Sequence, residues 1–291
     1  MFREHCMRHV TRKVLFTVLL SLSLQFLALA QDQGTQPMII VEPATPGPGD
    51  IITVTVKNTA GPVTGKFGNN MLYFNSLHDG FKAVLGIDLF TEPGEYTLGI
   101  TTQGTSTSHP LKVIKKEYPL QTLTLPNDMV ELSPKNEARV EREQKKMSAI
   151  WPNESAKTWA GDFINPLEGE IITMFGVRRV MNDIPKRPHS GVDVAGGLGD
   201  KVRAPNAGVV TLVDNQFFGG RSLVLDHGQG IFTMYFHLSK VLVKKGQRVK
   251  KGDVIAKVGA TGRATGPHLH WGVRMQGARV DPLELIHLKL E

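Results

Sequence analysis

Short apolar runs separated by glycine and proline turns occupy most of this chain and restrict it to a β-rich fold. The 291 residues include 30 glycines and 17 prolines. Strong turn signals such as residues 46–50 (PGPGD) and 92–95 (EPGE) lie between the runs 38–41, 51–56, 71–74, 83–87, 96–101 and 111–114. From Gly161 onward the glycine turns return, and tight hairpins of this kind build antiparallel sheets. We therefore expect an all-β protein.

The spacing of these runs predicts two domains joined by a connector. Residues 37–115 have the short strands and frequent turns of an Ig-like β-sandwich. Residues 116–160 form the connector, in which residues 133–150 predict a charged helix with Ser133 as N-cap and Pro134 at its first position. Since few of its positions are apolar, we expect a solvated helix. Residues 161–287 form a second domain of antiparallel sheet, without a substantial helix before residue 282.

The first 30 residues have the pattern of a secretory signal peptide. Basic residues at positions 3, 8, 12 and 13 precede an apolar stretch over residues 14–27, and Ala28-Leu29-Ala30 offers a cleavage site. The apolar stretch is shorter than the roughly 20 residues that a spanning helix needs, so we expect cleavage and no stable membrane insertion afterwards. This pattern predicts secretion across the inner membrane, to the periplasm or alternatively to the exterior.

Charge and cysteine content exclude some partners and some sources of stability. The formal net charge is +7, but lysines and arginines are dispersed, without the aromatic-interleaved basic stripe of a nucleic-acid-binding protein. A mild attraction to an anionic cell-wall polymer is compatible with this charge. Cys6 is the only cysteine and lies in the signal segment, so the mature domains must be stabilised by burial rather than by disulfides.

Two histidine motifs predict a metal site. His189 and Asp193 form a His-x3-Asp segment, and His268 and His270 form a His-x-His pair. On a strand, side chains repeat with period two, so both imidazoles of the pair lie on one face. Catalytic zinc sites use three nitrogen or oxygen ligands and one open position. Because the chain contains no His-Glu-x-x-His motif, a non-ligating imidazole is needed as the base.

The stretch 163–285 closely resembles the lysostaphin/LytM-type zinc endopeptidases of bacterial cell walls. The matching segments are residues 175–179 (FGVRR), 189–193 (HSGVD), 202–205 (VRAP), 225–228 (LDHG), 235–238 (YFHL), 259–262 (GATG), 266–271 (GPHLHW) and 281–282 (DP). The resemblance implies a fold of the duplicated-hybrid-motif type. It also implies that Zn²⁺ is bound by His189, Asp193 and His270, with His237 and His268 as catalytic histidines. The expected activity is hydrolysis of peptidoglycan stem peptides, at cross-links or bridges, by a zinc-activated water.

Several alternatives stay open at this stage. A catalytically inactive relative that activates another cell-wall hydrolase is the main rival, and a lipoyl- or biotinyl-type carrier is a weaker one, since no modifiable hairpin lysine is present. The glycines at 259, 262 and 266 favour tight turns over a phosphate site. His227 favours a structural role, and Asn182 fits either a turn or the site. The Ig-like module could make a regulatory contact with the active groove or bind the wall.

Overall fold

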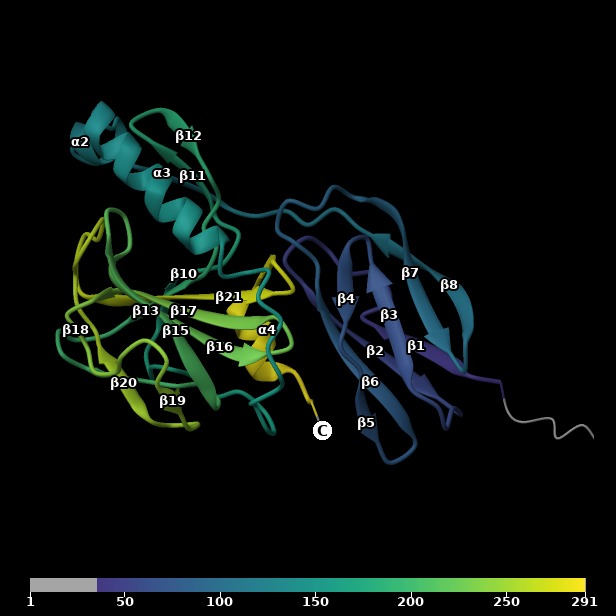
Figure 1. Cartoon of the computed structure of the whole chain (residues 1–291). Helices are drawn as coiled ribbons and strands as arrows, with labels where there is room; N and C mark the ends of the chain where they lie inside the picture. The colour runs from purple at the N-terminus through teal and green to yellow at the C-terminus, as the bar shows by residue number, and fades with distance from the viewer. Residues whose placement is uncertain (1–35, 291) are drawn as a thin grey trace, which may run out of the picture.

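The computed structural model describes residues 36–290, so the predicted signal peptide, residues 1–30, lies outside the described residues. The all-β prediction is confirmed, because the chain folds mainly into antiparallel sheets and carries only three described helices among residues 36–290 (Figure 1). None of the helices in this range has the length and apolar character needed to cross a bilayer.

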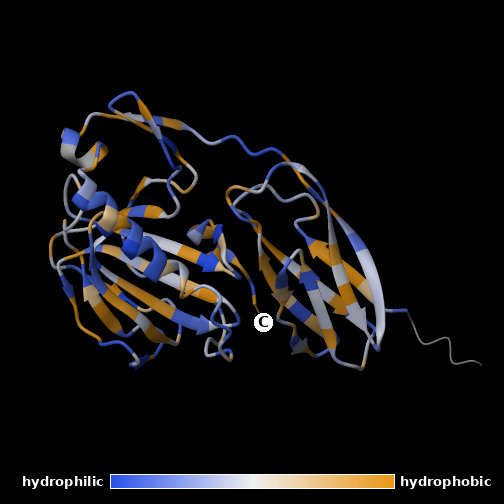
Figure 2. Ribbon diagram, turned by 45° about the horizontal axis from the view of Figure 1, so that its top comes forward, coloured by the Kyte–Doolittle hydropathy of each residue, from blue (hydrophilic) through white to orange (hydrophobic). Residues whose placement is uncertain are grey.

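The N-terminal body is a sandwich of two four-stranded sheets. One sheet has the order β1-β2-β6-β5 and the other β4-β3-β7-β8. The strands are β1 (Met38–Glu42), β2 (Ile51–Lys57), β3 (Val63–Phe67), β4 (Asn70–Leu72), β5 (Asn75–Leu77), β6 (Gly80–Gly86), β7 (Gly94–Thr102) and β8 (Thr105–Val113). Apolar and polar positions alternate along several of these strands (Figure 2), and the inward side chains, among them Val54, Leu85, Leu98 and Leu111, form one buried cluster.

The C-terminal body is built on one large sheet with two small sheets beside it. The large sheet has the order β10-β13-β21-β17-β16-β15-β19, and β22 pairs with β21. The small sheets have the orders β12-β11-β9 and β14-β20-β18. The strands are β10 (Ile171–Thr173), β11 (Arg178–Met181), β12 (Ile184–Lys186), β13 (Val192–Ala195), β14 (Lys201–Arg203), β15 (Gly208–Gln216), β16 (Gly220–Gly228), β17 (Ile231–Leu238), β18 (Lys240–Val241), β19 (Arg248–Val249), β20 (Val254–Lys257), β21 (His268–Met275) and β22 (Ala278–Val280), followed by helix α4 (Pro282–His287).

The connector joins the C-terminal body at two places. It consists of β9 (Leu120–Leu123), α2 (Asn127–Val130) and α3 (Pro134–Ser148). β9 pairs in parallel with β11, whereas the other pairings in the described chain are antiparallel. Ser133 caps α3 as predicted, with its hydroxyl accepting from Asn136 N at 3.4 Å.

The prediction of a solvated α3 holds for most of the helix but not for one side. Val140 is buried, and Met147 packs with Ile150 and Trp151 against a cluster that includes Phe232 and Met234 of the large sheet. Figure 1 shows the helix lying across this sheet. The few apolar residues of α3 are sufficient because they lie on one side and meet apolar side chains from distant strands.

The two bodies share a buried contact. Ile51, Val84 and Leu89 of the N-terminal body belong to the main hydrophobic cluster of the C-terminal body. Gly86 allows the close approach, because a Cβ there would lie 2.6 Å from a methyl carbon of Val280. Polar bonds flank this contact, since Asp88 accepts from the backbone N and guanidinium of Arg279 at 2.8 and 3.0 Å.

Candidate active site

The large sheet brings the two histidine motifs together. β13 and β21 pair antiparallel, with Asp193 opposite His270 and Ala195 opposite His268. Directly opposed residues point to the same face of a sheet, so Asp193, His270 and their neighbours at spacing two share one face. His189 lies just before β13, where its backbone exchanges hydrogen bonds with Val177 and Gly176 at 2.9 and 2.8 Å.

Three potential metal-ligand atoms converge in this arrangement. His189 Nε2 lies 2.8 Å from His270 Nδ1 and 3.0 Å from Asp193 Oδ1, and His270 Nδ1 lies 2.8 Å from the same oxygen. All three residues are buried. Tetrahedral zinc with bonds of about 2.0–2.2 Å places its donor atoms about 3.3–3.6 Å apart, so these three atoms lie close enough together to bind one ion.

The hydrogen bonds of His189 support a cation at this point. Its Nδ1 lies 2.9 Å from the carbonyl oxygen of Met174, so this nitrogen must carry the proton and donate it. Nε2 of a neutral His189 therefore presents a lone pair toward a carboxylate oxygen. Two acceptors face each other favourably only when a cation or an additional proton lies between them. The donor set thus fits a divalent metal such as zinc.

Arg179 is a site residue that the sequence reasoning did not assign a role. Its guanidinium lies 3.3 Å from Asp193 Oδ2, the oxygen that faces away from the histidines. Burial alone would raise the pKa of Asp193, but the adjacent imidazoles of His189 and His270 outweigh burial and hold this pKa well below its ordinary value. The motif residues 175–179 contained the signal, but only the fold shows that Arg179 reaches the carboxylate.

His237 and His268 stand beside the three ligand residues as a second pair. Their ring centroids lie 4.8 Å apart, and His237 is 6.1 Å from the ring of His270. Nδ1 of His237 donates to Thr261 O at 2.8 Å, and Nδ1 of His268 donates to Gly266 O at 2.9 Å. Both rings, when neutral, therefore keep an Nε2 lone pair. Burial lowers the pKa of His237 to about 4, with a further contribution from His270, so this ring is neutral near pH 7.

The backbone of His237 is strained. Its φ is +62°, a left-handed value that costs a non-glycine residue of the order of 1–2 kcal/mol. Its backbone N donates to Gly219 O at 2.7 Å, which holds the residue in this conformation. Strain of this kind concentrates at functional positions, which agrees with the assignment of His237 to the site.

A cavity of about 490 Å³ opens over these residues. Asp193, His237, His268 and His270 line it together with a connector segment, residues 121–126. Asn182 fixes this segment, because its side-chain amide bonds both the N and the O of Leu125 at 2.9 Å. Asn182 thus holds the connector in place. Among the lining residues described, none comes from the N-terminal sandwich.

His227 and the glycine turns have the structural surroundings that the sequence suggested. His227 is fully buried, with Nδ1 bonded to Ala207 O at 2.7 Å and Nε2 to Thr233 Oγ1 at 2.8 Å. Gly262 has a φ of +74°, and a Cβ there would lie 2.3 Å from the backbone N of Gly220. This turn packs against the loop that carries Gly219, the backbone partner of His237.

Known proteins resemble the chain most clearly around this site. The model of peptidase family M23 matches residues 187–282. Peptidoglycan DD-endopeptidase ShyA of Vibrio cholerae is 41% identical over 116 residues, which cover 39% of this chain and 27% of the relative. An uncharacterised metalloprotease of Haemophilus influenzae is 51% identical over 98 residues, which cover 33% of this chain and 21% of the relative. The matched region is thus about a quarter of these curated relatives.

A solved structure extends the similarity to most of the chain. A crystal structure from Pseudomonas aeruginosa, provisionally assigned to peptidase M23, is 33% identical with a TM-score of 0.69. The match covers 83% of this chain and 95% of that one, so it includes the N-terminal body and the connector as well as the motifs. The chain belongs to peptidase family M23.

Proposed function

We propose that this protein is a zinc-dependent endopeptidase that hydrolyses peptide bonds in peptidoglycan cross-links or bridges. The observation that carries the proposal is the convergence of His189 Nε2, Asp193 Oδ1 and His270 Nδ1 within 2.8–3.0 Å, beside two further histidines. Zinc bound there would activate a water molecule and polarise the scissile carbonyl.

The chain's own residues supply proton transfer and orientation. Met174 O and Arg179 orient His189 and Asp193. Nε2 of either His237 or His268 accepts a proton from the attacking water. The other, once protonated, donates to the oxyanion or to the leaving amine. The stacking of Phe236 on His270, at 5.3 Å and an interplanar angle of 11°, limits the freedom of the ring.

The substrate class rests on the relatives and on charge. ShyA is named as a peptidoglycan DD-endopeptidase, and the M23 family model matches residues 187–282, which contain the residues of the proposed site. Arg179 and Arg263 line the cavity and give it a positive character that suits the carboxylates of stem peptides. Together with the secretory pattern of residues 1–30, this supports action on the wall, in the periplasm.

Purified mature protein, zinc-loaded or treated with chelator, should be incubated with isolated sacculi and with defined cross-linked muropeptides. Mass spectrometry is expected to show new peptide termini only with the zinc-loaded protein, and these termini identify the peptidoglycan bond that is cut. An inactive activator of another hydrolase, the alternative function, would leave both substrates intact while stimulating that hydrolase.

We also propose that the connector, rather than the sandwich, controls access to the groove. Residues 121–126 line the cavity, whereas the sandwich residues Gly86 and Asp88 contact β22. In this proposal the Ig-like module, residues 37–115, supports the peptidase domain, residues 161–287, and is available for wall or partner binding on its outer surface.

A further inference from the structure

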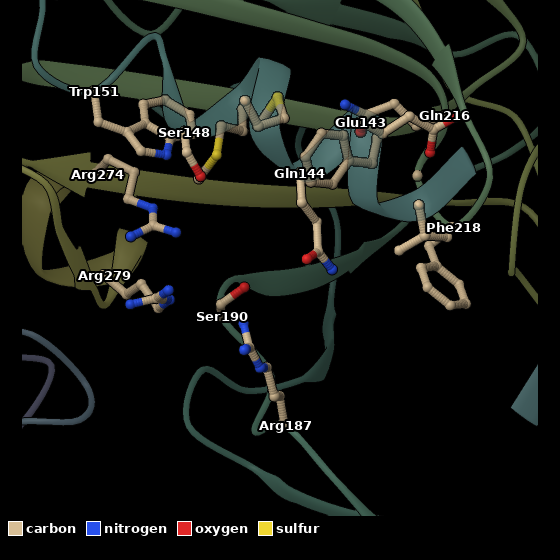
Figure 3. Close-up of a pocket in the computed structure, with 15 residues that line it drawn as sticks. Glu143, Gln144, Ser148, Trp151, Arg187, Ser190, Gln216, Phe218, Arg274 and Arg279 are labelled. Atoms are coloured by element: carbon tan, nitrogen blue, oxygen red, sulfur yellow. The ribbon is translucent and has the colours of Figure 1, made fainter. Parts of the chain in front are cut away.

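A second cavity lies between α3 and the face of the large sheet that carries the histidines. Its volume is about 350 Å³, and residues of α3, the loop around Ser190 and strands β17 and β21 line it. In Figure 3 the guanidinium groups of Arg187, Arg274 and Arg279 and the polar ends of Gln144 and Ser190 surround the same space. The function proposed above does not use this cavity.

The cavity carries positive charge that the described chain does not neutralise. Arg279 pairs with Asp88 at 3.0 Å. Arg274 donates to the carbonyl oxygen of Gly277 at 2.8 Å and lies over the ring of Trp151, but it has no carboxylate partner among residues 36–290. Arg187 is exposed and has no ion pair within the same range. The one acidic residue of the lining, Glu143, is bonded to Arg139 and to Phe217 N.

Two buried nitrogens of the lining lack hydrogen-bond acceptors. Gln216 is 8% exposed, and its Nε2 has no partner; Nε of Arg274 is likewise buried and unpartnered. Unsatisfied buried donors are costly and rare in folded proteins. Burial, together with the nearby Arg279, also lowers the pKa of Arg274 to about 10, so an anion in the cavity would stabilise its charged form.

The cavity lies over the same face of the large sheet as the proposed catalytic site. Met234 and Phe236 line it, and they pair across the sheet with Gly272 and His270. Ser190 follows His189 directly. Arg274 lies four positions after His270 on β21, which is about 13 Å at the rise of a strand. An extended peptide with its scissile bond at His270 would reach Arg274 with about four residues.

We propose that this cavity is a subsite for a carboxylate of an acidic peptide substrate, held by Arg274 and Arg187 about four residues from the bond that is cut. Arginine is suited to this task, because its planar fork of donors matches a carboxylate. Gln144 and Ser190 provide additional donors. This inference rests on the proposed peptidase function. It adds a selection for acidic stem peptides, and it gives α3 the role of forming one wall of the subsite.

Binding can be tested separately from hydrolysis. Uncross-linked stem peptide with free side carboxylates, and the same peptide with these carboxylates amidated, should be titrated into the mature protein by calorimetry. Trp151 fluorescence serves as a local reporter, with Trp151→Phe as its control. We expect the free acid to bind about tenfold more tightly, and Arg187→Gln and Arg274→Gln each to remove most of that difference. Arg248→Gln, an exposed arginine on β19, is the matched control and should retain it.

Hydrolysis of cross-linked dimers in both forms provides the second readout. We expect a lower KM for the free-acid dimer than for the amidated dimer in the wild type, and equal KM values for the two dimers in Arg187→Gln. Equal Kd values for the two stem peptides in the wild type would overturn the subsite. Hydrolysis without a carboxylate preference would overturn it while leaving the proposed function intact. A carboxylate preference in binding without any hydrolysis would support the subsite and reject the peptidase function. Arg187 is exposed, so its variant tests the proposal even where Arg274→Gln fails to fold.

Discussion

At the scale of single residues, the proposed site divides its five residues into two sets with different consequences on substitution. Replacing His189, Asp193 or His270 by Ala is expected to abolish both zinc retention and hydrolysis. A catalytic zinc site has three protein ligands, so the removal of one greatly lowers its affinity for zinc. Metal analysis of the purified variants checks this. Full zinc occupancy in Asp193→Ala would remove that residue from the ligand set.

His237 and His268 should behave differently. Their replacement by Ala is expected to leave zinc bound while the rate falls by about two to four orders of magnitude, the usual contribution of a positioned acid–base group. Steady-state rates and zinc content measured on the same samples separate the two effects. His78→Ala, at an exposed position of the sandwich, should change neither quantity. Near-normal turnover in His268→Ala would contradict the division of roles within His268-Leu269-His270.

Substitution of Arg179 tests whether its contact with Asp193 contributes to zinc binding. Arg179→Gln is expected to weaken zinc affinity by about 10- to 100-fold, because the contact to Asp193 Oδ2 orients the carboxylate. Competition with a chelator of known affinity measures the effect, and Arg179→Lys should lose less because the charge remains. An unchanged affinity in Arg179→Gln would show that the ion pair does not position the ligand.

At the scale of elements, the pairing of β9 with β11 holds the first half of the connector segment over the cavity, and the side chain of Asn182 holds Leu125 beyond it. Asn182 has a φ of +49°, so Asn182→Gly removes the amide that holds Leu125 without adding backbone strain. We expect hydrolysis of intact sacculi to rise about three- to tenfold, because residues 124–126, which follow β9, no longer restrict access. Hydrolysis of a short peptide should change little. A fall in the rate on both substrates would instead show that the segment builds the substrate-binding wall.

At the scale of the whole molecule, Glu284 makes the contact between the two bodies sensitive to pH. Its carboxylate accepts from Ile51 N at 2.6 Å, and burial, with a further contribution from Asp50, raises its pKa from 4.5 to about 7. A raised pKa of an acid means that folding favours the protonated form. The contribution of this group to the free energy of unfolding is therefore fully present below about pH 4.5, falls as pH rises toward 7, and changes no further above that.

Glu284→Gln keeps an acceptor for Ile51 and removes the ionisation. We expect it to flatten the pH dependence between about pH 4.5 and 7 and to stabilise the protein at pH 8 by about 1 kcal/mol, a figure reduced for the partial exposure of this side chain. Thermal unfolding across this pH range measures both effects. Glu168→Gln, at an exposed position, is the control and should leave the profile as in the wild type. A Glu284→Gln profile identical to that of the wild type would contradict the assignment.

The sequence by itself determined the features that depend on local pattern. Period-two apolar runs and glycine turns predicted the sheets, and Ser133-Pro134 predicted where α3 begins. The spacing within His189–Asp193 and His268–His270 indicated a metal site, because residues a few positions apart on a strand have a fixed relative orientation. The residues of each pair are close in sequence, so their spacing can be used without knowledge of the fold.

Only the tertiary structure decided which distant segments meet. The Asp193–His270 pairing depends on the register of β13 against β21. The contact of Arg179 with Asp193 depends on how β11 lies beside β13, and the connector wall depends on the parallel pairing of β9 with β11. The packing of α3 against Phe232 and Met234 has the same origin. Such contacts are set by the burial of many apolar side chains at once, so no local pattern of the chain contains them.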